Sequence, residues 1–496
     1  MLRLPAPTLD RSADTALADQ IAAFYRTAIR GGQLRAGDRL PPIREIAEAS
    51  GVTRAVVADA YRQLSDAGLV AGEVGRGTTV LASKDTAGPD GPLSAFAQAA
   101  LLQQQEMAGA PSLPTGRALV ANFAELAPDG AGFPVDALRA AMDRVLHTRG
   151  AEVLGYAHAA TGVRELREQI CERARSEDPS ASPDDILITA GAQQGLDLVL
   201  RTFCTQGDAV VLTSPSYHQM YGLLKAHGLR AVEVPFTQDG LDLAAFERAM
   251  TRADVKLCYL MPTFHNPTGR TLDEAQRRAV IDVAKRTEVP ILEDEYQSAL
   301  RFAGTQPPSL RTLDPRGLTV TVHTFSKGLF PGLRVGWVHG GARALRPMAA
   351  VKRFVDLETS PLLQVALCEF VKSGAMDRYL ASLTAELAER HATLQRELGD
   401  RLPEGCSLTK PQGGFVAWLE LPQAGHGDLL AELAVARGVR VVPGRAFDPH
   451  GRPSRGVRLS LSRASISQIE AGARVLVELC DELARGKSLA SSRNFL

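Results

Sequence analysis

A lysine directly after a long apolar run is the first residue of this chain that needs a chemical explanation. Lys327 follows the run "LTVTVHTF", which predicts a buried strand, and it stands between Ser326 and Gly328. A lysine is almost never fully buried without a partner. Its amine can, however, form a Schiff base with an aldehyde. The sequence therefore predicts a nucleophilic lysine at the end of a strand.

Other polar and aromatic residues follow other predicted strands. Asp294 ends "VPILEDEY", with Tyr296 two residues on, Asn266 lies in "PTFHNPTG" after "VKLCYLM", and Tyr217 ends "AVVLTSPSY". Each of these features alone has an ordinary explanation as a cap or a turn. Because ligands bind at the carboxyl ends of the strands in open α/β sheets, we expect these side chains to share one site.

Together these groups match the needs of one cofactor, pyridoxal 5′-phosphate (PLP). A carboxylate can keep the pyridine nitrogen protonated, an Asn and a Tyr can hydrogen-bond the phenolic oxygen, and an aromatic ring can stack on the pyridine. The helix that Gly191, Ala192 and Gln193 open after "DILIT" offers free backbone N–H groups. With Thr324 and Arg334, this helix end can hold a phosphate dianion.

The elements that carry these residues belong to a chain of more than one domain. Its 496 residues exceed what one core supports, since single cores stop growing near ~250–300 residues. From about residue 119, apolar runs alternate with segments long enough for helices, which predicts a largely parallel α/β sheet. The tail, roughly 350–496, has helices and short strands such as "GGFVAWLEL" and predicts a smaller α+β subdomain.

The composition argues against several other classes of protein. The formal net charge is zero, so the charge of the whole chain says nothing about partners. Six cysteines lie far apart without a Cys-x-x-Cys pair or clustered His, which argues against a metal site and a disulfide scaffold and favours reduced thiols in the cytoplasm. We expect no signal peptide and no membrane span, because the N-terminus lacks an apolar core and no uncharged apolar run reaches ~18 residues.

A different unit precedes the α/β part, in residues 14–82. "DTALADQIAAFYRTAIRGG" puts Leu17, Ile21, Phe24, Ala28 and Ile29 on one helical face. "PPIREIAEAS" and "RAVVADAYRQLSDAG" predict two more helices around a tight turn, and "LVAGEVGRGTTVL" predicts two short strands. This is the pattern of a winged helix-turn-helix. Residues 83–118, rich in small residues, Pro, Gly and Gln, predict a linker with one short helix.

The placement of arginines in this unit predicts contact with DNA. Residues 11–82 contain nine Arg, no Lys and eight acids, so the unit is only weakly basic. Arg44 opens the second helix, and Thr53 and Arg54 open the third, whose N-terminal residues should face the major groove. Arg76 stands at the tip of the wing, placed for the minor groove or a phosphate. The predicted DNA-binding residues are Arg44, Thr53, Arg54, Gly75, Arg76 and Gly77; the alternative is a winged helix used for protein contacts.

The motifs in these two parts resemble a known family. Positions ~119–465, with "SKGLFPGLRVGW", "HNPTG" and "EDEY", are similar to the fold type I, class I/II aminotransferases. Residues 14–82 are similar to the GntR-type winged helix-turn-helix, and the fusion resembles the MocR family of GntR-type transcriptional regulators. The resemblance implies a winged helix-turn-helix at 14–82, a linker at 83–118, and a PLP-binding, aminotransferase-like α/β domain at 119–485.

The resemblance also implies a role for each predicted site residue. Lys327 would hold PLP, Asp294 would pair with the pyridinium nitrogen, and Arg458 in "GVRLSLS" would grip a substrate α-carboxylate. Tyr156 would reach across a homodimer to the phosphate. The remaining implied contacts are Tyr296 and Asn266 with the 3′ oxygen, Tyr217 with the ring, and Gly191, Ala192, Gln193, Thr324, Ser326 and Arg334 with the phosphate.

Two functions fit this set of residues. The first is a cytoplasmic regulator that binds double-stranded operator DNA as a homodimer with exchanged DNA-binding domains, and senses an amino acid or amine by aldimine exchange on Lys327. The alternative is an active aminotransferase, with Lys327, Asp294 and Tyr296 catalytic and Arg458 and Asn266 binding the substrate. A third, a sensor of PLP itself, needs the same pocket. Many MocR-type proteins carry a Gln and an aromatic before Pro-Thr-Gly, whereas this chain has His265 and Asn266, as ordinary aminotransferases do, so the balance between catalysis and sensing stays open.

Overall fold

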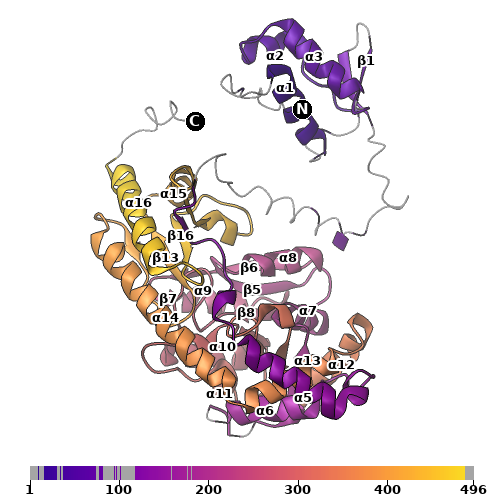
Figure 1. Cartoon of the computed structure of the whole chain (residues 1–496), viewed down its shortest axis with the longest axis vertical. Helices are drawn as coiled ribbons and strands as arrows, with labels where there is room; N and C mark the ends of the chain where they lie inside the picture. Colours follow the sequence, from indigo (N-terminus) through magenta and orange to yellow (C-terminus); the bar gives the residue numbers. More distant parts are fainter. Residues whose placement is uncertain are drawn as a thin grey trace. The chain divides into compact units, whose positions relative to one another are not determined.

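The chain forms two compact units that divide between about residues 94 and 109 (Figure 1). The predicted linker, 83–118, lies almost entirely outside the part of the chain that can be described. The computed structural model describes Leu9, residues 16–30, Leu34, residues 37–66, 68–73, 77–81, Ser94, residues 96–97, Leu101 and residues 118–485 apart from His158, Ser176 and Ser180.

The N-terminal unit has three helices followed by a hairpin. They are α1 (Leu17–Arg30), α2 (Ile43–Ala49), α3 (Arg54–Asp66), β1 (Val70–Glu73) and β2 (Gly77–Val80), with the two strands antiparallel. This is the predicted winged helix-turn-helix arrangement.

The helices of this unit pack around one apolar core. Of the face predicted for α1, Ile21, Ala28 and Ile29 are buried, whereas Leu17 and Phe24 are only half-buried. Tyr25, which the pattern did not single out, is fully buried. The Tyr61 hydroxyl of α3 donates to the Pro41 carbonyl at 2.8 Å, which ties α3 to the residues just before α2.

The larger unit is built on an eight-stranded mixed sheet in the order β4-β11-β10-β9-β8-β5-β6-β7. The pairs within β10-β9-β8-β5-β6 are parallel, whereas β11 is antiparallel to both of its neighbours and β7 is antiparallel to β6. The strands are β4 (Ile186–Thr189), β5 (Ala209–Ser214), β6 (Arg230–Thr237), β7 (Gly240–Leu241), β8 (Val255–Leu260), β9 (Ile291–Asp294), β10 (Thr319–Thr324) and β11 (Gly336–His339).

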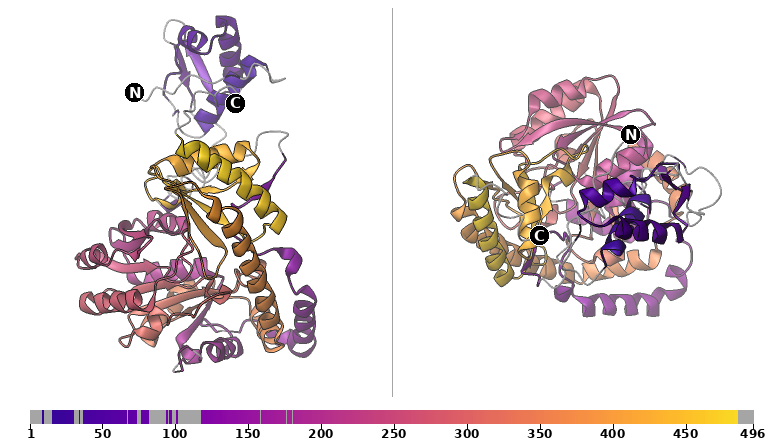
Figure 2. Two further views of the ribbon diagram at one scale, coloured as in Figure 1. Left: turned by 90° about the vertical axis from the view of Figure 1, so that its left-hand side faces the viewer. Right: turned by 90° about the horizontal axis from the view of Figure 1, so that it is seen from above.

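Helices cover both faces of this sheet, because its central strands are apolar on both sides (Figure 2). Along β5, Val210 and Leu212 pack with α7 and α8, whereas Ala209 and Val211 pack with α9 and α10 on the other face. The helices are α5 (Val135–Val153), α6 (Arg164–Ala174), α7 (Ala192–Phe203), α8 (His218–Ala226), α9 (Leu243–Met250), α10 (Glu274–Thr287), α11 (Leu310–Leu313), α12 (Ala342–Val355), α13 (Pro361–Lys372) and α14 (Ala375–Glu397).

The later part of the predicted tail folds as a small α+β subdomain, drawn in yellow in Figure 2, whereas α12 and α13 pack on the cores of the larger domain. An antiparallel sheet in the order β12-β13-β16-β15 packs against α15 (His426–Ala436) and α16 (Ile466–Ala484). Its strands are β12 (Ser407–Leu408), β13 (Val416–Glu420), β15 (Val442–Pro443) and β16 (Gly456–Ser460). A parallel pair joins β14 (Val439–Arg440) to β3 (Ala121–Asn122), so the start of the unit pairs with its end.

The described residues include neither a membrane-spanning helix nor a cluster of metal-ligating side chains. No helix there is long and apolar enough to cross a membrane. Nor do three or more His, Cys, Asp or Glu side chains gather there in an arrangement that could hold a metal ion.

Candidate functional site

Lys327 lies in the turn that follows β10 and is half-buried. Its Nζ donates a hydrogen bond to the Leu126 carbonyl at 2.7 Å. Burial, together with the positive charges of Arg458 and Arg334, lowers the pKa of Lys327 to about 8, and only Asp294 acts against them. A large share of this amine is therefore neutral and nucleophilic near pH 8.

Asp294 ends β9 with its carboxylate buried and only half satisfied. Its Oδ2 accepts from the Tyr259 hydroxyl at 2.8 Å, whereas its Oδ1 has no partner. Burial raises the pKa of Asp294 to about 6, against the hydrogen bonds from Tyr259 and the Tyr296 backbone and the charge of Lys327. A buried carboxylate oxygen without a donor is costly. It therefore suits a ligand that brings an N–H, such as a protonated ring nitrogen.

Arg458 lies on β16 and is buried without a carboxylate. Its Nη2 donates to the Ala124 carbonyl at 2.8 Å and its Nη1 to Asn266 Oδ1 at 3.3 Å, while its Nε has no partner. Its guanidinium lies 5.1 Å from the centre of the Phe447 ring. Burial lowers the pKa of Arg458 to about 10. No described carboxylate pairs with this guanidinium, so it can take a carboxylate from a ligand.

Arg334 and the start of α7 form an anion-binding corner. Gly191, the N-cap of α7, has φ +91°, and a Cβ there would lie 2.5 Å from Arg334 Nη2. Arg334 donates to Ser326 Oγ at 3.3 Å, and Thr324 Oγ1 accepts from the Ser326 amide at 3.0 Å. A helix N-terminus leaves backbone N–H groups free, here at Ala192 and Gln193, and an arginine beside it completes a phosphate site.

The two tyrosines of the predicted site, Tyr217 and Tyr296, lie near the same charged groups. Burial raises the pKa of Tyr217 and Tyr296, the charge of Asp294 raises both further, and that of Arg458 lowers both. The Tyr296 hydroxyl also accepts from Gln297 Nε2. The structure thus brings these two tyrosines together with Asp294, Lys327 and Arg458.

His265, which precedes Asn266, is fully buried, and both of its ring nitrogens have hydrogen-bond partners. Its two ring nitrogens lie 2.9 Å from Thr213 Oγ1 and 2.9 Å from Thr268 Oγ1, and its ring stacks on Phe236. Burial lowers the pKa of His265 to about 3, so its ring is neutral at physiological pH. This residue fixes the loop that carries Asn266.

Tyr156 is not buried with the other predicted site residues. It lies in the loop after α5 and is 71% exposed, next to Leu154 at 69%. The Ala157 amide donates to Glu358 Oε1 at 3.0 Å, which ties this loop to a segment that also carries the exposed Phe354 and Leu357. We call Leu154, Tyr156, Phe354 and Leu357 the apolar patch.

Three partners of these residues carried no signal in the sequence. Tyr259 lies inside the apolar run of β8, and only the pairing of β8 with β9 shows that its hydroxyl meets Asp294. The acceptors for Lys327 and Arg458 are the backbone carbonyls of Leu126 and Ala124. Every residue has a backbone carbonyl, whatever its side chain, so no sequence motif could reveal these acceptors.

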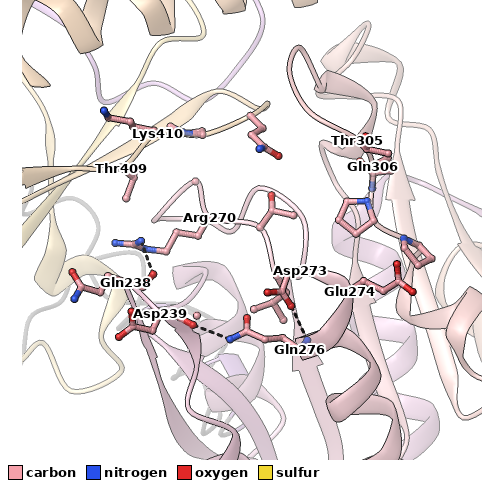
Figure 3. A pocket seen from close by; sticks show the side chains of 18 residues that line it. Gln238, Asp239, Arg270, Asp273, Glu274, Gln276, Thr305, Gln306, Thr409 and Lys410 are labelled. Atoms are coloured by element: carbon pink, nitrogen blue, oxygen red, sulfur yellow. Dashed lines mark hydrogen bonds between the residues drawn. The ribbon is translucent and has the colours of Figure 1, made fainter.

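A separate polar pocket opens between the loops of the sheet and residues 409–412 (Figure 3). Arg270 there donates to the Gln238 carbonyl at 3.2 Å, and Gln276 Nε2 donates to the Asp239 carbonyl at 2.8 Å. None of the predicted site residues lines this pocket. Its cations and carboxylates are mixed, and it offers no single kind of ligand group.

In the N-terminal unit the described candidates are all exposed. Arg44 lies on α2, Thr53 and Arg54 lie at the start of α3, and Gly77 opens β2 with φ +94°. Arg62 pairs with Asp59 on α3, as expected of a solvated face. Gly75 and Arg76, the predicted tip of the wing, lie outside the described residues.

Comparison with protein families matches each unit separately. The profile described as aminotransferase class I and II matches residues 121–476. The profile of the bacterial regulatory proteins of the gntR family matches residues 17–80.

Individual proteins match along nearly the whole chain, across both of its units. The chain is 28% identical over 491 residues to the HTH-type transcriptional regulator YisV of Bacillus subtilis, covering 95% of this chain and 98% of that protein. It is 27% identical over 464 residues to the probable rhizopine catabolism regulatory protein MocR of Rhizobium meliloti, covering 91% of each.

A solved structure matches the larger unit. The α-aminoadipate aminotransferase of Thermus thermophilus, crystallised with N-(5′-phosphopyridoxyl)-L-leucine, superposes with a TM-score of 0.70 at 28% identity. The match covers 79% of this chain and 98% of that enzyme.

Proposed function

Since the chain belongs to the class I and II aminotransferase family and carries the N-terminal domain of GntR-type regulators, as MocR-type regulators do, we propose that its larger domain binds PLP on Lys327 and senses an amino compound there. The family is PLP-dependent, and the regulatory relatives share both parts of this chain. What remains to be tested is the cofactor, the ligand and the role of each site residue.

One observation carries this proposal. A lysine amine with a pKa of about 8 shares a site with a buried carboxylate whose Oδ1 has no hydrogen-bond donor. Two guanidiniums without a described carboxylate, those of Arg334 and Arg458, act on the same lysine. An aldehyde, a ring N–H, a phosphate and a carboxylate would satisfy these four groups, and PLP with an amino acid brings all of them.

The residues of the site fit PLP group by group. When bound, PLP supplies an aldehyde and an electron-withdrawing ring. Asp294 Oδ1 would accept the ring N–H, and Arg334 with the start of α7 would hold the phosphate. Tyr217 would stack on the ring, and Tyr296 and Asn266 would contact its 3′ oxygen. The Leu126 carbonyl would accept a hydrogen bond from the Lys327 amine whenever that amine is not bonded to PLP.

Arg458 would set the class of ligand. Its Nε has no partner, and its burial strengthens a charge-assisted hydrogen bond to a carboxylate. The proposed ligand is therefore an amino compound with a carboxylate near its amino group. Asn266, which already contacts Arg458, would line the same end of the site.

The N-terminal unit would bind operator DNA through the exposed Arg44, Thr53 and Arg54, with Gly75, Arg76 and Gly77 as the wing. We propose that the protein works in the cytoplasm as a homodimer with exchanged DNA-binding domains, bounded as predicted at 14–82, 83–118 and 119–485. The exposed apolar patch around Tyr156 supports a second copy, since monomers rarely expose such clusters.

A second candidate function is transamination of an amino acid to a 2-oxo acid. The pKa of Lys327, lowered to about 8, favours it, because a lysine that is neutral near working pH can move a proton as a general base. Lys327, Asp294 and Tyr296 would then be catalytic. Sensing and catalysis use the same residues and differ in whether product is released.

The absorbance spectrum of the purified protein between about 300 and 500 nm tests the proposal. We expect a band near ~420 nm in the wild type and none in Lys327→Ala. Lys285→Ala, which removes a surface lysine of α10, is the matched control and should keep the band. A colourless wild type that added PLP cannot reconstitute would contradict the proposal.

A panel of amino acids and amines separates the two functions. A ligand that shifts the band and changes DNA affinity, without 2-oxo acid forming, supports sensing. Steady accumulation of 2-oxo acid from the same ligand supports the aminotransferase instead.

A further inference from the structure

The turn from β4 into α7, which the proposed function assigns to a phosphate, is held by a side chain that no sequence motif singled out. Gln194 is the third residue of α7, and its Oε1 accepts from the Ala190 amide at 2.7 Å. Ala190 comes directly before Gly191, the N-cap of α7. A glutamine at the third helical position can reach back to a backbone N–H at the start of its helix. The Gln194 side chain therefore fixes the peptide that leads into the proposed phosphate site.

The other end of the Gln194 amide is bonded to a carboxylate. Its Nε2 donates to Asp356 Oδ2 at 2.8 Å, although the two residues lie 162 positions apart in the sequence. Because a backbone N–H needs an acceptor and a carboxylate needs a donor, only one orientation of the amide satisfies both neighbours. Gln194 therefore connects Asp356 to the Ala190 amide.

Asp356 is itself held in place by a buried lysine. Lys352 of α12 is 1% exposed, and its Nζ donates to Asp356 Oδ1 at 2.8 Å. A lysine buried this deeply requires a partner, which keeps the carboxylate beside it. Since the two charges are opposite and adjacent, their fields largely cancel at a distance. The pair would therefore act on a bound phosphate by holding Gln194 rather than by attraction.

The loop that carries Asp356 is fixed at further points. Asp356 caps the C-terminus of α12, where its amide donates to the Lys352 carbonyl at 3.0 Å. Leu357 has φ +58°, a left-handed conformation that strains a residue with a Cβ. The Glu358 side chain accepts from the Ala157 amide at 3.0 Å. Backbone strain persists only where the surroundings enforce it, so this loop is held in a set position.

The carbonyl of Ala190 faces Arg334. It accepts from Arg334 Nη2 at 3.5 Å, and a Cβ on Gly191 would lie 2.5 Å from the same nitrogen. The two backbone groups of Ala190 thus contact Gln194 on one side and Arg334 on the other. A shift of Ala190 would change where Arg334 and the first amides of α7 lie.

We propose that Gln194 and Asp356 are positioning residues for the phosphate group of PLP. Asp356 orients the Gln194 amide, and that amide holds Ala190. Ala190 in turn sets the place of Arg334 and of the amides at the start of α7. Neither of the two positioning side chains needs to touch the phosphate. The inference rests on the proposed function, since it assumes that PLP binds at Lys327.

A comparison of two ligands isolates the phosphate group. The full-length apoprotein is titrated with PLP and with pyridoxal, which lacks the phosphate, and binding is followed by protein fluorescence. Gln194→Met removes both hydrogen bonds of the amide and leaves the pair of Lys352 and Asp356 intact. We expect its affinity for PLP to fall roughly tenfold, as for the loss of one net hydrogen bond. Its affinity for pyridoxal should not change, because that ligand makes no phosphate contact.

A glutamine elsewhere on the surface provides the matched control. Gln169 on α6 also donates to a carboxylate, that of Glu172, at 3.1 Å, so Gln169→Met should leave both affinities unchanged. Equal losses of PLP and pyridoxal affinity in Gln194→Met, or no loss of either, would overturn this inference alone. A wild type that binds neither ligand would overturn the proposed function together with the inference.

A second change tests whether Asp356 acts through Gln194. Asp356→Ala is combined with Lys352→Met, so that no buried charge is left unpaired. We expect the same selective loss of PLP affinity, and no further loss when Gln194→Met is added, because the side chains form one series of hydrogen bonds. Losses that add would mean that Asp356 acts by another route and would overturn its role as a positioning residue.

Discussion

The Asp294 carboxylate depends on one neighbour, the Tyr259 hydroxyl, for its side-chain hydrogen bond. Burial already raises the pKa of Asp294, and this hydrogen bond works against that rise. A hydrogen bond to a charged group contributes ~1.5–3 kcal/mol. Tyr259 is thus a positioning residue for the group that would hold the ring nitrogen.

Removal of that hydroxyl should weaken PLP binding. In Tyr259→Phe we expect the affinity of the apoprotein for PLP to fall by roughly 10-fold, because the carboxylate loses its side-chain donor and its charged form becomes less favourable. The measurement is a fluorescence titration with PLP. Tyr221→Phe removes another buried tyrosine hydroxyl, which donates to the Thr213 carbonyl at 3.4 Å, and should leave the affinity unchanged. Equal losses in both variants would contradict the role of Tyr259.

The lowered pKa of Lys327 predicts a pH dependence for the capture of PLP. Only the neutral amine attacks an aldehyde, and the pKa of Lys327 falls from 10.5 to about 8. The capture rate should therefore rise nearly tenfold per pH unit below pH 8 and level off above it. Stopped-flow absorbance of the apoprotein with PLP, from pH 6 to 9.5, measures this profile. A rate that still climbs steeply above pH 9 would mean that the pKa of Lys327 is not lowered.

At the scale of elements, the turn from β4 into α7 is shaped by one glycine. Gly191 has φ +91°, which strains any residue with a Cβ, and such a Cβ would also strike Arg334. Gly207 has a similar φ of +94°, but a Cβ added there would have no other atom within 4 Å. A comparison of substitutions at the two glycines therefore separates the effect of backbone strain from the effect of contact with Arg334.

Substitution of these two glycines should give different results. Gly191→Ala and Gly207→Ala should each lower the free energy of unfolding by about 1–3 kcal/mol through the left-handed backbone. Only Gly191→Ala should also weaken PLP binding, by roughly 10-fold or more, because Arg334 must move. Thermal unfolding and PLP titration of both variants provide the measurements. Unchanged PLP affinity in Gly191→Ala would remove Arg334 and the start of α7 from the phosphate site.

The start of α3 offers a test of the DNA-binding element. Arg54 is the first residue of α3 and is exposed, whereas Arg62 on the same helix pairs with Asp59. Arg54→Ala should weaken binding to a selected operator fragment by roughly 5- to 100-fold, or about 1–3 kcal/mol. Arg62→Ala should change it much less. Fluorescence anisotropy at one fixed salt concentration measures both, and equal effects would argue against α3 as the recognition helix.

Much of this arrangement was predictable because polar residues end apolar runs. Asp294 and Lys327 follow β9 and β10, and the carboxyl ends of neighbouring parallel strands meet at one edge of the sheet. β6 was missed because most of its residues are exposed or half-buried, and β11 because it begins inside the motif that contains Lys327. The partner of Asp294 depends on the register of β8 and β9, which the sequence of either strand alone does not determine.

At the scale of the whole molecule, the apolar patch predicts self-association. Phe354 is 94% exposed, and Leu154, Tyr156 and Leu357 are each more than half exposed. Phe354→Asp should raise the dissociation constant of the dimer at least tenfold, because a charge would be buried in the contact. Analytical ultracentrifugation over a range of concentrations measures this. Arg474→Asp, a larger charge change at an exposed position of α16, is the control, and equal dissociation of both variants would exclude the patch as the interface.

The stretch of backbone from Ala118 to Leu126 has a consequence for ligand binding. It follows the N-terminal unit in the sequence, and its strand β3 pairs with β14. Further on, its carbonyls at Ala124 and Leu126 hold Arg458 and Lys327, the two cations proposed to bind ligand. A ligand that draws either cation away breaks one of the hydrogen bonds that hold this stretch. The occupied and empty states would thus differ in how firmly residues 118–126 are held.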